Sequence, residues 1–395
     1  MPKRLVFVTL AGQGHVTPSL PLVEELVRRR HRVDYATGSE YADAVVGAGA
    51  RWVPLPSLKP FSAPARVSSE TILSWLQHYF AAMSATYPVL YEHCSATRPD
   101  AVCYDTTNWP GRLVAEKLGI PPVRCIPNLA SNEAFSLDDD LMGGIDADHP
   151  VMVALAAECA RFSDEHGVHL DFAGTMDVVE ALNLVFVPRE FQPAGETFDD
   201  RFRFVGPLLG QRERKEPWTP RVPDLPVLFV SLGSVFTDAA FYRTCLEAFR
   251  DGAWQVAMTV RDVDPASLGP IPSTVDIRPW FPQPAVLGHA SAFVSHAGMN
   301  STMEALCFRV PIVAFPHTPE QVINANRVQE LGLGERLDSA TPSPEELRAV
   351  VTRVASSGAV RANLDRMQDA IRRSGGAVRG ADEIEQYLGL GTTTG

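Results

Sequence analysis

The sequence contains no hydrophobic run long enough to cross a membrane. Its first residues, MPKRLVFVTL, combine a short basic start with an apolar run, and Ala11-Gly-Gln-Gly-His15 interrupts that run at once. This pattern is typical of a first β-strand and not of a signal peptide. We therefore expect a soluble cytoplasmic protein without a membrane span.

Cysteine is also sparse, and no two of the six cysteines form a CxxC pair or have the spacing of metal ligands. Widely separated cysteines are typical of a reducing compartment, where they serve as small buried hydrophobic residues. The sequence thus favours neither a disulfide framework nor a metal centre. The cysteines are Cys94, Cys103, Cys125, Cys159, Cys245 and Cys307.

Positive charge is scarce as well, because 35 Lys and Arg residues face 47 Asp and Glu residues, a formal net charge of −12. A nucleic-acid-binding protein needs a basic face, so the composition argues against that class of partner. It does not argue against local binding of a nucleotide. The 395 residues predict two or three domains with two sizeable cores.

The glycine fingerprint of NAD-binding proteins is incomplete. Gly12-Gln-Gly follows the first predicted strand, but the sixth position of G-x-G-x-x-G is Thr17. Asp34 falls inside the second predicted strand, where the fingerprint needs an acidic residue at the end. A dehydrogenase is therefore weakly supported.

Apolar strands alternate with helical patterns along the chain, which predicts an α/β fold with doubly wound parallel sheets. The alternation stops in a charged, proline-rich stretch and then restarts. We therefore expect two Rossmann-like domains that face each other across a cleft, with ligands at the carboxyl ends of the strands. The predicted parts are a first domain over 1–210, a linker over 211–226, a second domain over 227–374 and a terminal helix over about 375–395 that packs on the first domain.

The stretch from Ser295 to Gln321, SHAGMNSTMEALCFRVPIVAFPHTPEQ, reads as strand end, glycine turn, helix, strand, loop and helix. A helix that begins directly after a strand offers free N–H groups and the positive end of its dipole to an anion. We infer a diphosphate site here. Ser301 and Glu304 are either a capping box or contacts to phosphate and ribose. Glu320 and Gln321 are either first-turn residues of the next helix or contacts to sugar hydroxyls.

His15 and Asp105 both follow predicted strands. His15 is either a loop histidine bonded to the backbone or a general base. Asp105 is either the cap of the helix that begins near Trp109 or the carboxylate that orients the histidine. Both lie at the edge of the sheet where ligands bind, and the pair favours acid–base chemistry.

Two further motifs have a structural and a functional interpretation. Ser231-Leu-Gly-Ser234 is either an ordinary turn or a place where backbone N–H groups approach a phosphate. Trp280 in WFPQ is either a core residue or a platform for a base, with Gln283 beside it. The run Asp138-Asp139-Asp140 lacks companion ligands and is interpreted as a solvated loop rather than a metal site.

Taken together, the segments GQGHVTPSLPLVEEL, SLGS, WFPQ, HAGMNSTMEAL and PEQ resemble the nucleotide-sugar glycosyltransferases of the GT-B fold. They are most similar to the bacterial macrolide and natural-product glycosyltransferases, relatives of the UDP-glycosyltransferases of plants and animals. The similarity is densest over 227–331 and sparse over 57–100 and 130–180.

The resemblance implies that His15 is the general base and Asp105 the residue that orients it. It also implies an inverting reaction that requires no metal and no cofactor besides the donor substrate, a UDP-sugar or dTDP-sugar.

For the diphosphate, the resemblance implies contacts from the donor-binding half of the chain. The residues concerned are Ser234, His296, Gly298, Asn300 and Ser301.

For the nucleoside and the sugar, the resemblance implies that Trp280 stacks on the base with Gln283 beside it. It assigns the ribose to Glu304 and the sugar to Glu320 and Gln321. Many relatives have Asp where this chain has Glu320, which leaves the choice of sugar open.

We therefore expect an enzyme that transfers glucose from UDP-glucose to a hydroxyl of a hydrophobic small molecule such as a macrolide. A dTDP-deoxysugar-dependent enzyme and a non-catalytic GT-B-like activator are the alternatives. The protein is expected to be a monomer or a homodimer. Candidate acceptor contacts, which have helical spacing typical of core residues, are Trp75, Tyr79, Phe80, Met83 and Phe135.

Overall fold

The computed structural model describes residues 1–56, 69–137, 145–146, 148–171, 175, 177–210 and 217–389. These residues divide into two compact units: the first comprises those up to 210 and from 372 onward, and the second those between 217 and 371. The predicted loop over 57–67, the aspartate run 138–140, residues 211–216 of the predicted linker and residues 390–395 lie outside the described residues.

The first unit contains a seven-stranded parallel sheet with the strand order β3-β2-β1-β4-β5-β6-β7. Its strands read as nearly continuous hydrophobic runs, as buried parallel strands do. The strands are β1 (Arg4–Val8), β2 (Arg32–Thr37), β3 (Arg51–Pro54), β4 (Ala101–Asp105), β5 (Pro122–Ile126), β6 (Asn183–Val185) and β7 (Phe202–Phe204).

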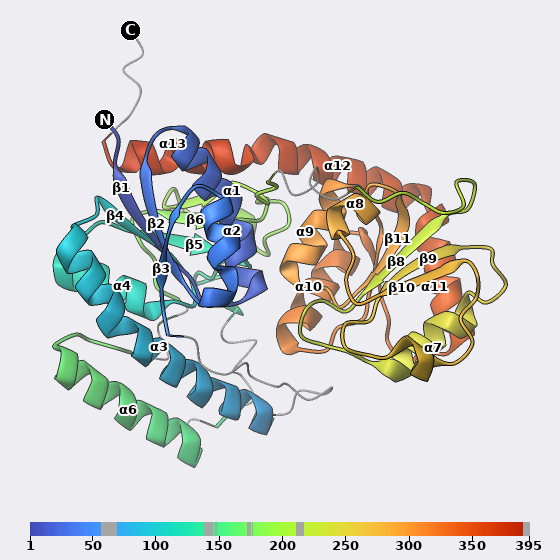
Figure 1. Ribbon diagram of the computed structural model, residues 1–395, viewed down its shortest axis with the longest axis horizontal. Coiled ribbons are helices and arrows are strands. Elements are labelled where there is room, and N and C mark those ends of the chain that lie inside the picture. Colours follow the sequence, from blue (N-terminus) through green and yellow to red (C-terminus); the bar gives the residue numbers. More distant parts are fainter. Residues whose placement is uncertain are drawn as a thin grey trace, which may run out of the picture. The chain divides into compact units, whose positions relative to one another are not determined.

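Helices cover both faces of this sheet (Figure 1). One face packs against α1 (Gln13–Arg28), α2 (Ala42–Gly47) and α13 (Gly376–Tyr387). The other face packs against α3 (Ser69–Thr97), α4 (Trp109–Leu118) and α6 (Pro150–His166). The alternation of side chains along each strand therefore supplies two cores.

The second unit contains a six-stranded parallel sheet with the order β10-β9-β8-β11-β12-β13. Its strands are β8 (Val227–Ser231), β9 (Gln255–Thr259), β10 (Val275–Arg278), β11 (Ala290–Ser295), β12 (Ile312–Ala314) and β13 (Gly334–Arg336). Its helices are α7 (Ala239–Ala248), α8 (Gln283–Leu287), α9 (Met299–Cys307), α10 (Pro319–Glu330), α11 (Pro344–Ser356) and α12 (Gly358–Ser374), which ends at the boundary with the first unit. The predicted α/β class with two doubly wound sheets is thus confirmed.

Strand β13 was not predicted from the sequence. It is only three residues long and begins with Gly334, a residue depleted in strands. A methyl group at Gly334 would lie 1.9 Å from the carbonyl oxygen of Ile312, so the close approach of the two strands requires glycine.

Each sheet reverses its strand order at one place, between β1 and β4 in the first and between β8 and β11 in the second. In open α/β sheets, ligands bind at such switch points, beyond the carboxyl ends of the two strands. His15 and Asp105 follow β1 and end β4, whereas Ser234 and His296 follow β8 and β11. The residues predicted to carry chemistry therefore lie at both switch points.

The pair Thr17-Pro18 predicts a helix with Thr17 as its cap and Pro18 as its first residue, but α1 begins earlier. Thr17 does not cap the helix, because the N-cap is Gly12 in an extended conformation, and Pro18 and Pro21 lie inside the helix. They are the sixth and ninth residues of α1, where each proline removes the N–H that would bond to the carbonyl four residues earlier. His15 consequently belongs to the first turn of α1 and not to a loop.

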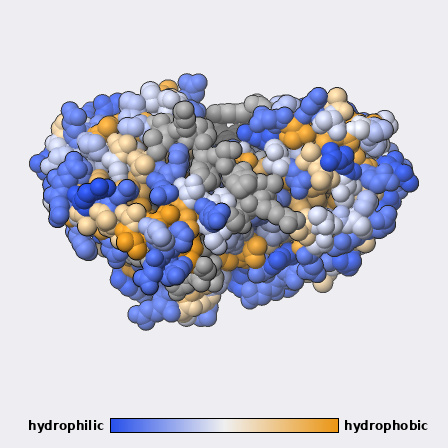
Figure 2. Space-filling model, turned by 90° about the horizontal axis from the view of Figure 1, so that it is seen from below, coloured by the Kyte–Doolittle hydropathy of each residue, from blue (hydrophilic) through white to orange (hydrophobic). Residues whose placement is uncertain are grey.

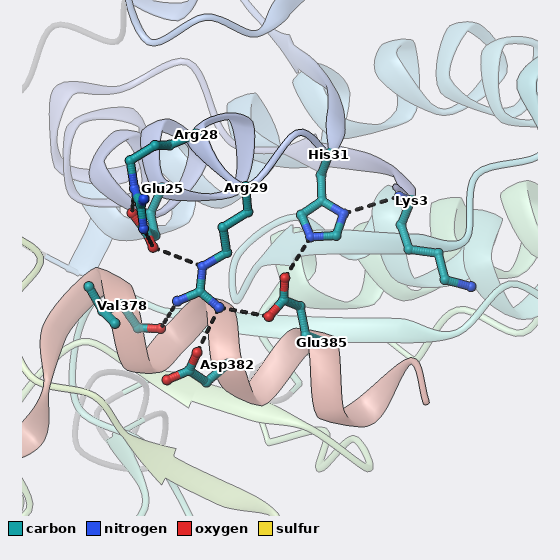
Figure 3. Close-up of polar contacts among 8 residues, drawn as sticks. All are labelled: Lys3, Glu25, Arg28, Arg29, His31, Val378, Asp382 and Glu385. Atoms are coloured by element: carbon teal, nitrogen blue, oxygen red, sulfur yellow. Dashed lines mark hydrogen bonds and ion pairs between the residues drawn. The ribbon is translucent and has the colours of Figure 1, made fainter. Parts of the chain in front are cut away.

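Helix α13 is fastened to α1 by ion pairs (Figure 3). The guanidinium of Arg29 contacts Glu25 at 2.8 Å, Asp382 at 2.6 Å and Glu385 at 2.7 Å. The pKa of Glu25 falls to about 2 because Arg28 and Arg29 stabilise its charge against the cost of burial. His31 extends the network, since it contacts Glu385 at 2.9 Å.

On the face drawn in Figure 2, hydrophobic residues form small separate patches within a mainly hydrophilic surface. None of the helices in the described part of the chain is both long and apolar enough to span a membrane.

Replacement of Arg29 by alanine should weaken the packing of α13 on α1, because the Arg29 guanidinium forms ion pairs with three carboxylates. We expect the free energy of local unfolding of α13 to fall by about 2 kcal/mol, measured by amide hydrogen exchange over residues 376–387. Arg28→Ala is the control, since Arg28 is 70% exposed and bonds to Glu25, and it should change exchange little. Equal acceleration in the two variants would contradict this role of Arg29.

Candidate active site

In the first unit, the histidine and the aspartate at the switch point are hydrogen-bonded to each other. Nδ1 of His15 lies 3.1 Å from Oδ1 and 3.0 Å from Oδ2 of Asp105. Asp105 is 2% exposed, whereas His15 keeps 27% of its side chain exposed. The alternative role of Asp105 as a helix cap is wrong, because Asn108 caps α4 by accepting a bond from the Gly111 N–H.

Asp105 is negatively charged at neutral pH despite its enclosure. Burial raises its pKa, but the charge of His15 and hydrogen bonds from His15 and Thr107 outweigh burial, so the pKa of Asp105 is lowered. A carboxylate can only accept hydrogen bonds, so Nδ1 of His15 carries the shared hydrogen. When the ring is neutral, Nε2 has the lone pair that a general base needs.

In the second unit, β11 leads directly into a helix whose first turn has no side-chain cap. Ala297 adopts a left-handed conformation with φ of 61°, and the N-cap is Gly298, which has no side chain to accept hydrogen bonds. The first helical residue is Met299, so Ser301 is the third residue of α9. A capping box needs its serine at the N-cap, so that interpretation of Ser301 and Glu304 is wrong.

The ring of His296 lies between two glycines that leave room for it. A methyl group at Gly233 would lie 2.6 Å from Cε1 and Nε2 of the ring, and one at Gly298 would lie 2.5 Å from Nε2. Burial, together with the smaller effect of the neighbouring His317, lowers the pKa of His296 to about 4. His296 is therefore neutral at pH 7, and its Nδ1 is buried without a partner among the described residues.

Three predicted donor contacts form one polar cluster. The amide nitrogen of Gln283 donates to Oε2 of Glu304 at 2.7 Å and lies 3.2 Å from the hydroxyl of Ser301. These bonds orient the carboxylate of Glu304 on the surface of α9. Trp280, which precedes the cluster, is 47% exposed, so its interpretation as a core residue is wrong.

The remaining donor candidates differ in their surroundings. Thr318 caps α10, and the buried Gln321 uses its side-chain oxygen to accept the His317 N–H at 2.8 Å. Gln321 therefore shapes the loop before α10. Glu320 and Asn300 are half-buried, and Ser234 is exposed on the loop after β8.

Sequence reasoning missed His317, which follows β12 and approaches His296. Its ring stacks on Phe236 with centroids 5.4 Å apart and contacts the edge of Phe315. Burial lowers its pKa, and Nε2 has no partner among the described residues. The available signal was a histidine three residues after the end of a buried strand, in the loop that leads to the next helix.

The acceptor candidates fall into two groups. Tyr79, Phe80 and Met83 are buried in a hydrophobic core that includes Trp109, as their helical spacing favours. Trp75 is 37% exposed and stacks on Tyr79 with centroids 5.1 Å apart. Phe135 is half-buried.

Taken by unit, the chain combines a histidine held by a carboxylate at one switch point with a helix terminus that has no side-chain cap at the other. Two Rossmann-like units are the architecture of the GT-B glycosyltransferases.

Comparison with known proteins identifies the family. Residues 246–374 match the model for the erythromycin biosynthesis protein CIII-like C-terminal domain. The chain is 38% identical to the NDP-glycosyltransferase YjiC of Bacillus subtilis, over 96% of both chains. It is 37% identical to demethyllactenocin mycarosyltransferase of Streptomyces fradiae, over 97% of this chain and 86% of that protein. The chain therefore belongs to the macrolide and natural-product glycosyltransferases.

A solved structure supports the same conclusion. The calicheamicin glycosyltransferase CalG4 matches with a TM-score of 0.85 and 38% identity, over 98% of each chain. At this identity and coverage the predicted GT-B fold and the predicted enzyme class are both confirmed.

A methyl group at Gly233 should displace the ring of His296. We expect Gly233→Ala to lower the free energy of unfolding by about 1 kcal/mol more than Gly252→Ala does, because a clash adds to backbone strain. Gly252 is the matched control, since it also has positive φ, 75° against 81°, but its nearest neighbour would lie at 3.7 Å. Chemical denaturation measures both, and equal losses would show that His296 does not need the space.

Proposed function

We propose that this protein is an inverting, metal-independent glycosyltransferase that moves glucose from UDP-glucose to a hydroxyl of a hydrophobic small molecule such as a macrolide. The observation that carries the proposal is the bonded pair of His15 and Asp105 at the switch point of the first sheet. A histidine held in this way can act as the general base that takes the proton of an alcohol near neutral pH.

The reaction begins with the acceptor. Nε2 of His15 takes the proton of the acceptor hydroxyl, and the imidazolium that forms is stabilised by the charge of Asp105. The acceptor oxygen then attacks the anomeric carbon from the face opposite the diphosphate. The bond to the diphosphate breaks as the new bond forms, and a single displacement inverts the configuration.

The leaving diphosphate requires charge stabilisation, and α9 supplies it. The first-turn N–H groups after Gly298 and the side chains of Asn300 and Ser301 act as donors. His296 acts as a neutral N–H donor, because its pKa is about 4. Ser234 approaches the same group from the loop after β8. Such preorganised donors are each worth about 3 kcal/mol in a transition state, which leaves no requirement for a metal ion.

The nucleoside is held beside the phosphates. The exposed indole of Trp280 stacks on the uracil, and Gln283 bonds to the base or the ribose. The carboxylate of Glu304, oriented by Gln283, accepts bonds from the two vicinal ribose hydroxyls. Glu320 and Gln321 contact the sugar.

A dTDP-deoxysugar donor is the second candidate. The relative from Streptomyces fradiae is named as a mycarosyltransferase, and mycarose is not glucose. The oriented carboxylate of Glu304 favours UDP, because ribose offers two vicinal hydroxyls and deoxyribose only one.

For the acceptor, the exposed Trp75 stacked on Tyr79 offers an apolar surface in the first unit. A hydrophobic hydroxyl compound suits an aromatic surface of this kind.

The role of His15 is tested by His15→Ala with UDP-glucose and a phenolic or macrolide acceptor. We expect kcat to fall by about 10² to 10⁴ with little change in the KM for UDP-glucose, because only proton transfer is lost. His169→Ala is the control, since His169 is exposed on the same unit. Turnover within a few-fold of the wild type would overturn the assignment of the base.

The role of Glu304 is tested by calorimetric binding of UDP and dTDP. We expect Glu304→Ala to weaken UDP binding about tenfold more than dTDP binding, because deoxyribose has already lost one of the two hydroxyls. The exposed Glu345 on α11 serves as control when changed to alanine. Equal weakening of UDP and dTDP would contradict the ribose contact and favour the dTDP-deoxysugar alternative.

A further inference from the structure

The carboxylate of Asp105 has a second partner besides His15, and the reaction as proposed does not use it. Thr107 donates twice to Oδ1 of Asp105, through its backbone N–H at 2.9 Å and through its hydroxyl at 2.5 Å. A hydroxyl that donates to a carboxylate makes one of the stronger classes of hydrogen bond. Thr107 thus holds the oxygen that also faces Nδ1 of His15.

Thr107 is itself held from α3. The hydroxyl of Tyr79 donates to the carbonyl oxygen of Thr107, and the Tyr79 side chain is buried. The ring of Tyr79 also stacks against the ring of Trp75, and the two ring planes are 8° apart. A continuous path of contacts therefore runs from the partly exposed Trp75 through Tyr79 and Thr107 to Asp105.

We propose that Thr107, held in place by Tyr79, is a positioning residue that fixes the orientation of the Asp105 carboxylate and the share of its charge that reaches His15. This inference rests on the proposed role of His15 as the general base. It extends that role, because it connects the aromatic surface of α3 to the proton-transfer pair.

Other titratable groups near Asp105 lie on strands β5 and β2 of the same sheet. Arg124 and Cys125 on β5 and Tyr35 on β2 all interact with the charge of Asp105. The buried guanidinium of Arg124 donates to the hydroxyl of Thr106 at 2.6 Å and so holds the adjacent residue of the loop. Tyr35 bonds to Ser19.

The direction of the effect follows from charge. The Thr107 hydroxyl draws negative charge toward itself, so its removal leaves more charge facing His15. The protonated ring of His15 is then stabilised, so it loses its proton at a higher pH. Loss of the hydroxyl should move the titration of the His15–Asp105 pair to higher pH.

The test follows the ring resonances of His15 by NMR in the ligand-free protein, with His15→Gln used to assign them. We expect Thr107→Val to raise the midpoint by about half a pH unit or more, and Thr107→Ser to return it to the wild-type value. Valine keeps the shape of threonine, so a purely structural role would alter thermal stability and not the midpoint.

The variant Tyr79→Phe tests the contact of Tyr79 with Thr107 separately from the contact of Thr107 with Asp105. If Tyr79 acts through Thr107, Tyr79→Phe shifts the midpoint in the same direction, and the double variant with Thr107→Val shifts it no further than Thr107→Val alone. An unchanged midpoint in Thr107→Val, or a serine variant that behaves like valine, would overturn the proposal.

This experiment is independent of catalysis. If His15→Ala keeps its activity while Thr107→Val shifts the titration, the base assignment fails and the positioning contact stands. If His15→Ala is inactive and the titration does not move, the base assignment stands and the role of Thr107 fails.

Discussion

The geometry of a parallel sheet is the constraint on which both candidate sites depend. Every strand points the same way, so the residues that follow neighbouring strands arrive at one edge. Val8 pairs with Tyr104, which places the start of α1 close to Asp105. Ser231 pairs with Ser295, which places the SLGS turn beside His296. Residues 90 positions apart in sequence, such as His15 and Asp105, meet for this reason.

Burial and hydrogen bonds together set the charge of these residues at neutral pH. The same burial keeps His296 neutral, whereas Asp105 stays charged because it gains hydrogen bonds from His15 and Thr107. In the proposed reaction, a neutral N–H donor suits a diphosphate bound at a helix terminus, and a fixed carboxylate suits a histidine that becomes positive when it takes a proton. Gly233 and Gly298 contribute by having no side chain where the ring of His296 lies.

The sequence was sufficient to predict the fold class, because hydrophobic strands alternate with helices twice along the chain. It also predicted that His15 and Asp105 lie at the same sheet edge. It did not predict that His15 belongs to α1, since Pro18 suggested a later helix start. Nor did it predict the bonds of Gln283 to Glu304 or of Thr107 to Asp105, because side-chain contacts between separate elements leave no periodic pattern. Strand β13 was not predicted either. Its first residue, Gly334, is required by the close approach of Ile312, although glycine has a low propensity for strands.

The most direct test of the account is a crystal structure of the protein with UDP bound. The account predicts that the uracil stacks on Trp280, that the ribose hydroxyls contact Glu304, and that the phosphates lie against His296 and the first turn of α9. A nucleotide bound instead at Gly12-Gln-Gly after β1, with the turn after β11 empty, would contradict it.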